Sequence, residues 1–281
     1  MNETPTVDER ANQLFELFLT PQARDTSPKA LRLLENARRV AISHRQILEW
    51  PAISRPPIKL AGFVWDGAPD AANAAPTALL VHGWELQAGR MGAFVPPLLA
   101  AGLRVAALDM PAHGQSEGSQ ATMLDWAEAI KNAVQQMGNV KAVVAHSFGG
   151  MSAAWLLAHE QNLGVEKLVL MASGTDVEFL IRNSPYAQSA GLEQMQAMRE
   201  AFRQRVGRWP AEFDAAQEAA NMKIPALVVH DVRDPIVPFA HGEAYVRAIP
   251  NARLLATSGL GHTAGLRDVD VVAAAVAFLA D

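Results

Sequence analysis

Ser147 lies between a short apolar run and a segment with helical spacing, and small residues flank it in residues 143–150 (VVAHSFGG). A tight turn from a strand into a helix crowds the positions two before and two after a nucleophile, here Ala145 and Gly149. The following helix directs backbone N–H groups at the serine, so the N–H of Phe148 could serve an oxyanion. The pattern predicts a nucleophilic serine, and a glycine-rich helix start chosen only for packing is the alternative.

A histidine and an aspartate later in the chain could activate this serine. His262 lies in a glycine-containing loop, residues 258–263 (SGLGHT), after an apolar run. Histidine suits the role of base because its unperturbed pKa lies near working pH. The acid must hydrogen-bond the far ring nitrogen of that histidine, and both Asp231 and Asp234 follow another apolar run. The three residue types together predict covalent acyl transfer.

The elements that must position these residues alternate from about residue 58 onward. Strands are expected at 58–65, 77–82, 104–109, 140–146, 167–172, 224–230 and 253–257. Helices are expected at 91–101, 123–137, 148–160, 239–249 and 268–280. Buried parallel strands read as continuous apolar runs, as residues 142–145 and 226–229 do. The alternation predicts an α/β fold with a mostly parallel, doubly wound sheet.

Residues 1–57 differ from the rest and are expected to form a helical N-terminal extension. Apolar residues return at three- and four-residue steps between Leu31 and Leu48. Ser27 and Pro28 supply a helix cap and a first-turn proline.

One connection is too long for a simple crossover, because about fifty residues separate Ala172 from Ile224. We expect a helical cap insertion at 175–221, with the α/β core formed by 58–174 and 222–281. Its apolar side chains are expected to line a substrate pocket, or else to pack the cap onto the core: Phe179, Met195, Met198 and Phe202.

With these motifs the sequence from about 58 to 281 resembles the α/β-hydrolase family. The matching segments are residues 143–150, where Ala145 replaces the first glycine of G-x-S-x-G, residues 82–84 (HGW), and residues 109–116 (DMPAHGQS), where Ala112 replaces a glycine. The chain order Ser147, Asp234, His262 is also the order of that family.

The resemblance implies the roles of several residues. Asp234 would be the acid, because the family places it three residues before a Val-Pro pair, and Asp231 is the fallback. The backbone N–H groups of Trp84 and Phe148 would form the oxyanion hole. The remaining polar residues of the motifs would be structural: His82, Asp109, His113 and Ser116.

The function that this resemblance implies is hydrolysis of a carboxylic ester with a small or medium apolar substrate, through an acyl-enzyme on Ser147. The same triad could instead serve a C–C bond hydrolase, a lactonase or a perhydrolase. A non-catalytic member that binds a small ligand is the other alternative, because fold does not guarantee function.

Composition excludes several other classes of protein. The chain has 24 basic and 29 acidic residues, a net charge of −5, and 50% hydrophobic residues. We therefore expect no nucleic-acid or membrane partner. The first residues do not read as a secretory signal and no apolar stretch is long enough to span a membrane, so we expect a cytoplasmic location. A small-molecule substrate is what the resemblance implies, and a homo-oligomer is left open. Because cysteine is absent, disulfides, thiolate catalysis and cysteine-ligated zinc are excluded, and no metal or other cofactor is expected.

Overall fold

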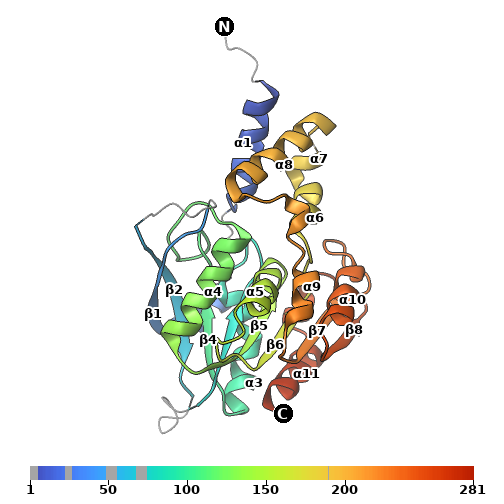
Figure 1. Cartoon of the computed structure of the whole chain (residues 1–281). Helices are drawn as coiled ribbons and strands as arrows, with labels where there is room; N and C mark the ends of the chain where they lie inside the picture. Colours follow the sequence, from blue (N-terminus) through green and yellow to red (C-terminus); the bar gives the residue numbers. More distant parts are fainter. Residues whose placement is uncertain (1–5, 23–26, 49–55, 68–74, 189) are drawn as a thin grey trace.

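A computed structural model gives the fold. It describes residues 6–22, 27–48, 56–67, 75–188 and 190–281. Figure 1 shows a twisted sheet flanked by helices, with further helices gathered beyond one end of the strands. Among the described helices, none is both long enough and apolar enough to cross a membrane.

The described strands form one eight-stranded sheet in the order β1-β2-β4-β3-β5-β6-β7-β8. Their bounds are β1 (Arg38–His44), β2 (Ile58–Trp65), β3 (Thr77–Val81), β4 (Arg104–Leu108), β5 (Val140–His146), β6 (Lys167–Met171), β7 (Ala226–Asp231) and β8 (Ala252–Thr257). β2 runs antiparallel to β1 and β4, and the pairs from β4 to β8 are parallel. The mostly parallel sheet expected from the apolar runs is confirmed.

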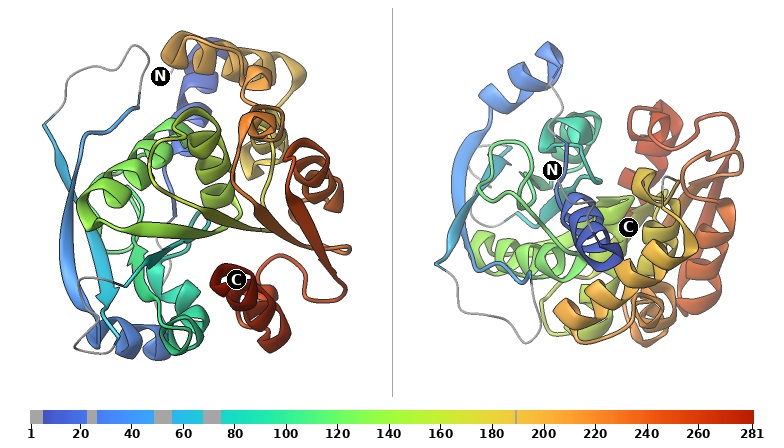
Figure 2. Two further views of the ribbon diagram at one scale, coloured as in Figure 1. Left: turned by 60° about the horizontal axis from the view of Figure 1, so that its bottom comes forward. Right: turned by 90° about the horizontal axis from the view of Figure 1, so that it is seen from above.

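Helices cover both faces of this sheet (Figure 2). One face carries α4 (Met123–Met137), α5 (Phe148–His159) and α10 (Phe239–Ala248). The other carries α2 (Pro28–Glu35), η2 (Ala88–Phe94), α3 (Val95–Ala100) and α11 (Val269–Ala280). Every residue of the central strand β3 is consequently buried. The continuous apolar runs follow from this double covering.

The expectation of helix between Leu31 and Leu48 is wrong for Arg38–His44, which form the edge strand β1. Val40, Ile42 and His44 are less exposed than the residues between them, so a two-residue period also fits this segment. Pairing with β2 decides the outcome, because it satisfies the backbone and buries these alternate side chains. Residues 1–5, 23–26 and 49–55 of the expected extension lie outside the described residues.

Helices also occupy the expected cap segment: α6 (Val177–Asn183), α7 (Pro185–Gln188), α8 (Leu192–Val206), η3 (Pro210–Glu212), α9 (Ala215–Glu218) and η4 (Ala219–Asn221). The N-terminal helix α1 (Val7–Leu19) packs against α8 (Figure 1), and the rings of Phe15 and Phe202 meet edge to face at 6.0 Å. α9 contacts α5 and α10 of the core instead. The division into core and cap at 175 and 221 stays a prediction.

A buried ionisable pair joins β1 to α4. The side chains of His44 and Asp125 are fully buried, and His44 Nε2 lies 2.9 Å from Asp125 Oδ1. The same oxygen accepts the N–H of Ile47 at 2.7 Å, and the other accepts Gln46 Nε2 at 3.2 Å. Asp125 therefore holds both the edge strand and the segment that follows it.

Replacing Asp125 with alanine is expected to lower the free energy of unfolding by about 3 kcal/mol, because buried N–H donors lose their acceptor. Urea denaturation measures the change. Gln135→Ala, on the exposed side of the same helix, should change the free energy of unfolding by less than about 0.5 kcal/mol. Equal stability of the two variants would contradict the prediction.

Candidate active site

Ser147 sits on a sharp turn between β5 and α5. Its φ of 53° and ψ of −119° are unusual for a residue with a side chain, and its N–H donates to the carbonyl of Met171 at 2.9 Å. A Cβ on Gly149 would overlap the carbonyl oxygen of His82, and one on Gly150 would overlap the hydroxyl of Ser173. The small residues after Ser147 are therefore required by close packing at this turn.

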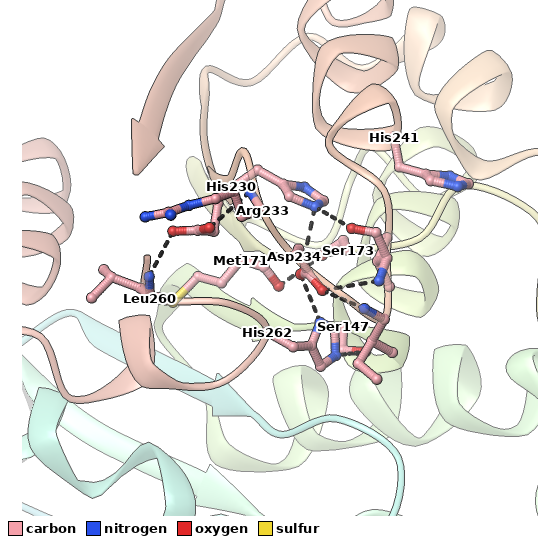
Figure 3. Close-up of polar contacts among 12 residues, drawn as sticks. Ser147, Met171, Ser173, His230, Arg233, Asp234, His241, Leu260 and His262 are labelled. Carbon is pink, nitrogen blue, oxygen red and sulfur yellow. Dashed lines mark hydrogen bonds and ion pairs between the residues drawn. The ribbon is translucent and has the colours of Figure 1, made fainter. Parts of the chain in front are cut away.

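The structure brings Ser147, His262 and Asp234 together at the carboxyl ends of β5, β8 and β7 (Figure 3). His262 Nε2 lies 3.0 Å from Ser147 Oγ, and His262 Nδ1 lies 2.8 Å from Asp234 Oδ2. The other oxygen of Asp234 accepts the N–H groups of Ile236 and Val237 at 2.8 and 3.0 Å. The carboxylate is thus fixed by backbone groups on one side and faces the imidazole on the other.

The protonation state of Asp234 sets the tautomer of His262. Burial raises the pKa of this carboxyl, but hydrogen bonds from His262 and from the N–H groups of Val237 and Ile236 outweigh it and leave the pKa below its ordinary value. The ionised carboxylate only accepts hydrogen bonds, so Nδ1 of the neutral imidazole carries the proton. Nε2 is then free to accept the hydroxyl proton of Ser147.

Asp231, the alternative acid, is bound elsewhere. Its Oδ2 accepts Thr257 Oγ1 at 2.9 Å and the N–H of Leu260 at 2.8 Å, and its Oδ1 accepts the N–H of Arg233 at 2.9 Å. Burial raises its pKa, but hydrogen bonds led by those of the Leu260 and Arg233 N–H groups lower it to about 2. Asp231 therefore fixes the loop that leads to His262.

His146 also holds that loop, a role that no pattern in the sequence indicates. Its Nε2 lies 2.9 Å from the backbone carbonyl of His262, and its side chain is buried. Burial lowers its pKa to about 3, so the neutral ring donates its Nε2–H to this carbonyl. The residue before the nucleophile thus ties the histidine loop to β5.

A cavity of about 580 Å³ opens beside Ser147 and His262. Of the four residues expected at a substrate pocket, Phe179 and Phe202 line this cavity and Met195 and Met198 do not, and a role in substrate binding stays a prediction. For the two methionines the alternative expectation of packing holds: they are buried in the hydrophobic cluster that also contains Phe15. α8 turns this face toward α1, a helix that the sequence did not assign to the cap.

A family model described as the alpha/beta hydrolase fold matches residues 76–220, slightly more than half of the chain. The chain belongs to the α/β-hydrolase fold family. A second model, described as TAP-like protein, matches residues 195–281.

Curated relatives of this α/β hydrolase are distant. It is 26% identical over 201 residues to the alpha/beta hydrolase domain-containing protein aho-3 of Caenorhabditis elegans, covering 70% of this chain and 54% of that protein. The chain thus spans about half the length of this relative. It is 26% identical over 250 residues to 2-hydroxy-6-oxononadienedioate/2-hydroxy-6-oxononatrienedioate hydrolase 1 of Dechloromonas aromatica, covering 72% and 85%.

A third relative is the pimeloyl-[acyl-carrier protein] methyl ester esterase of Aromatoleum aromaticum, 24% identical over 232 residues and covering 66% of this chain and 91% of that protein. Among solved structures, the esterase Pf2001 of Pyrococcus furiosus superposes with a TM-score of 0.65 at 18% identity, covering 93% and 96%. At this identity the structural likeness shows the fold alone.

The two residues expected to form the oxyanion hole of this hydrolase border the same cavity. The rings of Trp84 and Phe148 pack edge to face, with their centroids 5.2 Å apart. Phe148 is the first residue of α5, where N–H groups lack intrahelical acceptors. A Cβ on Gly83 would lie 3.0 Å from Ser147 Cβ, so the turn after β3 passes directly beside the nucleophile. The role of the Trp84 and Phe148 N–H groups as donors to an oxyanion stays a prediction.

The polar motif residues that were expected to have a structural role form hydrogen bonds with backbone groups. His82 Nε2 accepts the N–H of Met110 at 3.0 Å, and His113 Nε2 accepts the N–H of Glu85 at 3.0 Å. Asp109 accepts two further N–H groups, and Ser116 donates to the carbonyl of Asp109. These contacts shape the loops after β3 and β4. Within the described ranges, no three His, Asp or Glu side chains gather as a metal site would require.

Three buried histidines should make folding sensitive to mild acid. Burial lowers the pKa of His82 to about 4 and those of His113 and His146 to about 3. Above pH 6.5 these groups are neutral in both states, but below it only the unfolded chain takes up protons. We expect protonation of each of these three histidines in the unfolded chain to lower the free energy of unfolding by about 2 kcal/mol at pH 5.

Urea denaturation at pH 7.5 and pH 5 measures this loss of stability. Both pH values lie above the range in which protonation of Asp234, whose pKa is lowered, would affect the free energy of unfolding. His113→Gln should reduce the difference in the free energy of unfolding between the two pH values by about 2 kcal/mol, since it removes one of these groups. The same stability of the wild type at both pH values would contradict the prediction.

Proposed function

We propose that this α/β hydrolase cleaves carboxylic esters through an acyl-enzyme on Ser147. The observation that carries the proposal is the continuous hydrogen-bonded chain from Asp234 through His262 to the Ser147 hydroxyl at the edge of an apolar cavity. A serine next to a base that is itself oriented by a carboxylate is the arrangement that activates a hydroxyl for attack on a carbonyl carbon.

The steps follow from the positions of the protons. His262 Nε2 takes the proton of Ser147 Oγ as this oxygen bonds to the ester carbonyl carbon, and Asp234 stabilises the imidazolium. The N–H groups of Trp84 and Phe148 donate to the oxyanion. The imidazolium then protonates the departing alcohol as its C–O bond breaks. Water attacks the acyl-enzyme in the same way, with His262 as base, and releases the acid and free Ser147.

Ester hydrolysis is favoured by the apolar character of the cavity and by one of the curated relatives, which is named a methyl ester esterase. Aromatic and aliphatic side chains border the cavity, among them Phe148, Phe179 and Leu180. We therefore propose a small or medium apolar substrate.

Hydrolysis of a C–C bond is a second candidate, because another relative is named as a hydrolase of an oxononadienedioate. A panel of p-nitrophenyl esters and a vinylogous diketone separates the two chemistries. We expect turnover of the esters and none of the diketone. Turnover of the diketone alone would overturn the ester proposal. Turnover of lactones alone, or peracid formation alone, would likewise replace it with the corresponding chemistry.

Covalent labelling by a fluorophosphonate tests the nucleophile and separates an enzyme from a ligand-binding protein. Wild type should be labelled and Ser147→Ala should not. Ser184→Ala is a matched control, because Ser184 also borders the cavity but donates its hydroxyl to the carbonyl of Ile181 at 2.9 Å. Its labelling should persist. A folded wild type without labelling would contradict the proposed function.

A further inference from the structure

The N-terminal helix α1 forms part of the cavity wall, although it lies more than a hundred residues before Ser147 in the chain. Leu17, Phe18, Leu19 and Thr20, at the end of this helix, all border the cavity. In the view from above (Figure 2, right), α1 is seen near the middle of the molecule, next to α8. Leu17 is 44% exposed, so it lies where the cavity meets solvent.

Contacts on both sides hold α1 in this position. Glu16 receives hydrogen bonds from Arg205 of α8 and from Gln120, in the segment before α4. The N–H of Ala121 donates to the carbonyl of Leu19 at 3.0 Å, and Arg205 also lies over the ring of Phe15. α1 therefore joins the cap to the core across the cavity.

The chain after α1 also contacts the turn next to the nucleophile. The N–H of Gln22 donates to Glu85 Oε1 at 3.1 Å, and Glu85 directly follows Trp84. Glu85 has a φ of 56°, a left-handed conformation that is uncommon for a residue with a side chain. The position of α1 is thereby linked to the position of the turn that carries Trp84.

The charges around the cavity restrict what it can bind. Of the described residues that border it, none is Lys or Arg, and Glu85 is the carboxylate among them. An anionic group on the substrate would lose its hydration here without gaining a cationic partner, which is unfavourable. The cavity therefore suits an uncharged chain and disfavours a dicarboxylate such as the dioate for which one relative is named.

We propose that α1 is a wall of the acyl-binding site and selects uncharged esters with an extended apolar acyl chain. This inference rests on the proposed function. The acyl group is the part that stays on Ser147 through both chemical steps, so it is the part that the cavity must hold. Phe18, half-buried in the wall, sets how favourably a long chain binds.

A chain-length series measured on α1 variants tests the wall. Phe18→Ala should lower kcat/KM for p-nitrophenyl octanoate about 10-fold, because buried apolar contact with the chain is lost. Its kcat/KM for p-nitrophenyl acetate should change less than about twofold, since acetate does not reach the wall. Acetate turnover also shows that the variant is folded. Gln13→Ala, at an exposed position of the same helix, should leave both values unchanged.

A matched pair of substrates tests the charge. p-Nitrophenyl octanoate and mono-p-nitrophenyl suberate have the same chain length, but suberate ends in a carboxylate. We expect kcat/KM for the suberate ester to be at least about 100-fold lower, because its charge is buried unpaired. Equal values would overturn the selection for uncharged chains.

The outcomes distinguish this inference from the function on which it rests. Labelled Ser147 and acetate turnover, with an octanoate-to-acetate ratio that Phe18→Ala does not change, would overturn the α1 inference alone. A folded wild type with neither labelling nor ester turnover would overturn both.

Discussion

Ser147→Ala is expected to lower kcat for p-nitrophenyl butyrate by about 10⁶-fold, on the scale known for removal of a serine nucleophile. Without Oγ no acyl-enzyme forms, and His262 Nε2 has no hydroxyl proton to accept. The walls of the cavity do not change, so binding of the ester should persist. Steady-state kinetics measure the loss of turnover, and equilibrium dialysis of the ester against the variant measures binding.

Ser152→Ala is the matched control for this variant. Ser152 lies one helical turn later on α5, is buried, and donates its hydroxyl to the carbonyl of Phe148 at 2.9 Å. Its loss removes a buried hydrogen bond but no reacting group, so kcat should stay within about threefold. A Ser147→Ala protein that keeps more than about one hundredth of the wild-type kcat would mean that another group is the nucleophile.

The inner strands of the parallel part of the sheet could be predicted because they are covered on both faces. A strand such as β3 must then be apolar at every position, and this leaves a continuous run in the sequence. β1 gives no such run, because it pairs on one side only and exposed residues alternate with Val40 and Ile42. Its place depends on pairing with β2, a contact that local periodicity does not contain.

The site shows the same limit. The Ser147 motif and the glycine-containing loop of His262 are local, so the sequence reveals both. For Met195 and Met198 the sequence could not decide between pocket lining and packing, because α1 meets α8 only in the folded chain. The contact of His146 with the carbonyl of His262 also joins residues 116 positions apart. Long-range packing of this kind leaves no periodic signal in a single sequence.

Asp231 and Asp234 lie three residues apart, and only the resemblance to a family could indicate from the sequence which of them is the acid. The geometry separates them by their partners. Asp234 accepts from His262 Nδ1 at 2.8 Å, whereas Asp231 accepts from Thr257 and from the N–H of Leu260. We therefore expect different phenotypes when each of the two carboxylates is replaced.

Asp234→Asn is expected to lower kcat about 10⁴-fold with little change in the overall structure. The amide group of asparagine would donate to Nδ1 of His262 and so place the ring proton on Nε2, which could then no longer accept the proton of Ser147. Asp231→Asn should lower kcat less than about 10-fold, because it disturbs the loop and leaves the tautomer of His262 unchanged. Steady-state kinetics on one ester compare the two variants, and a larger loss in Asp231→Asn would show that Asp234 is not the acid.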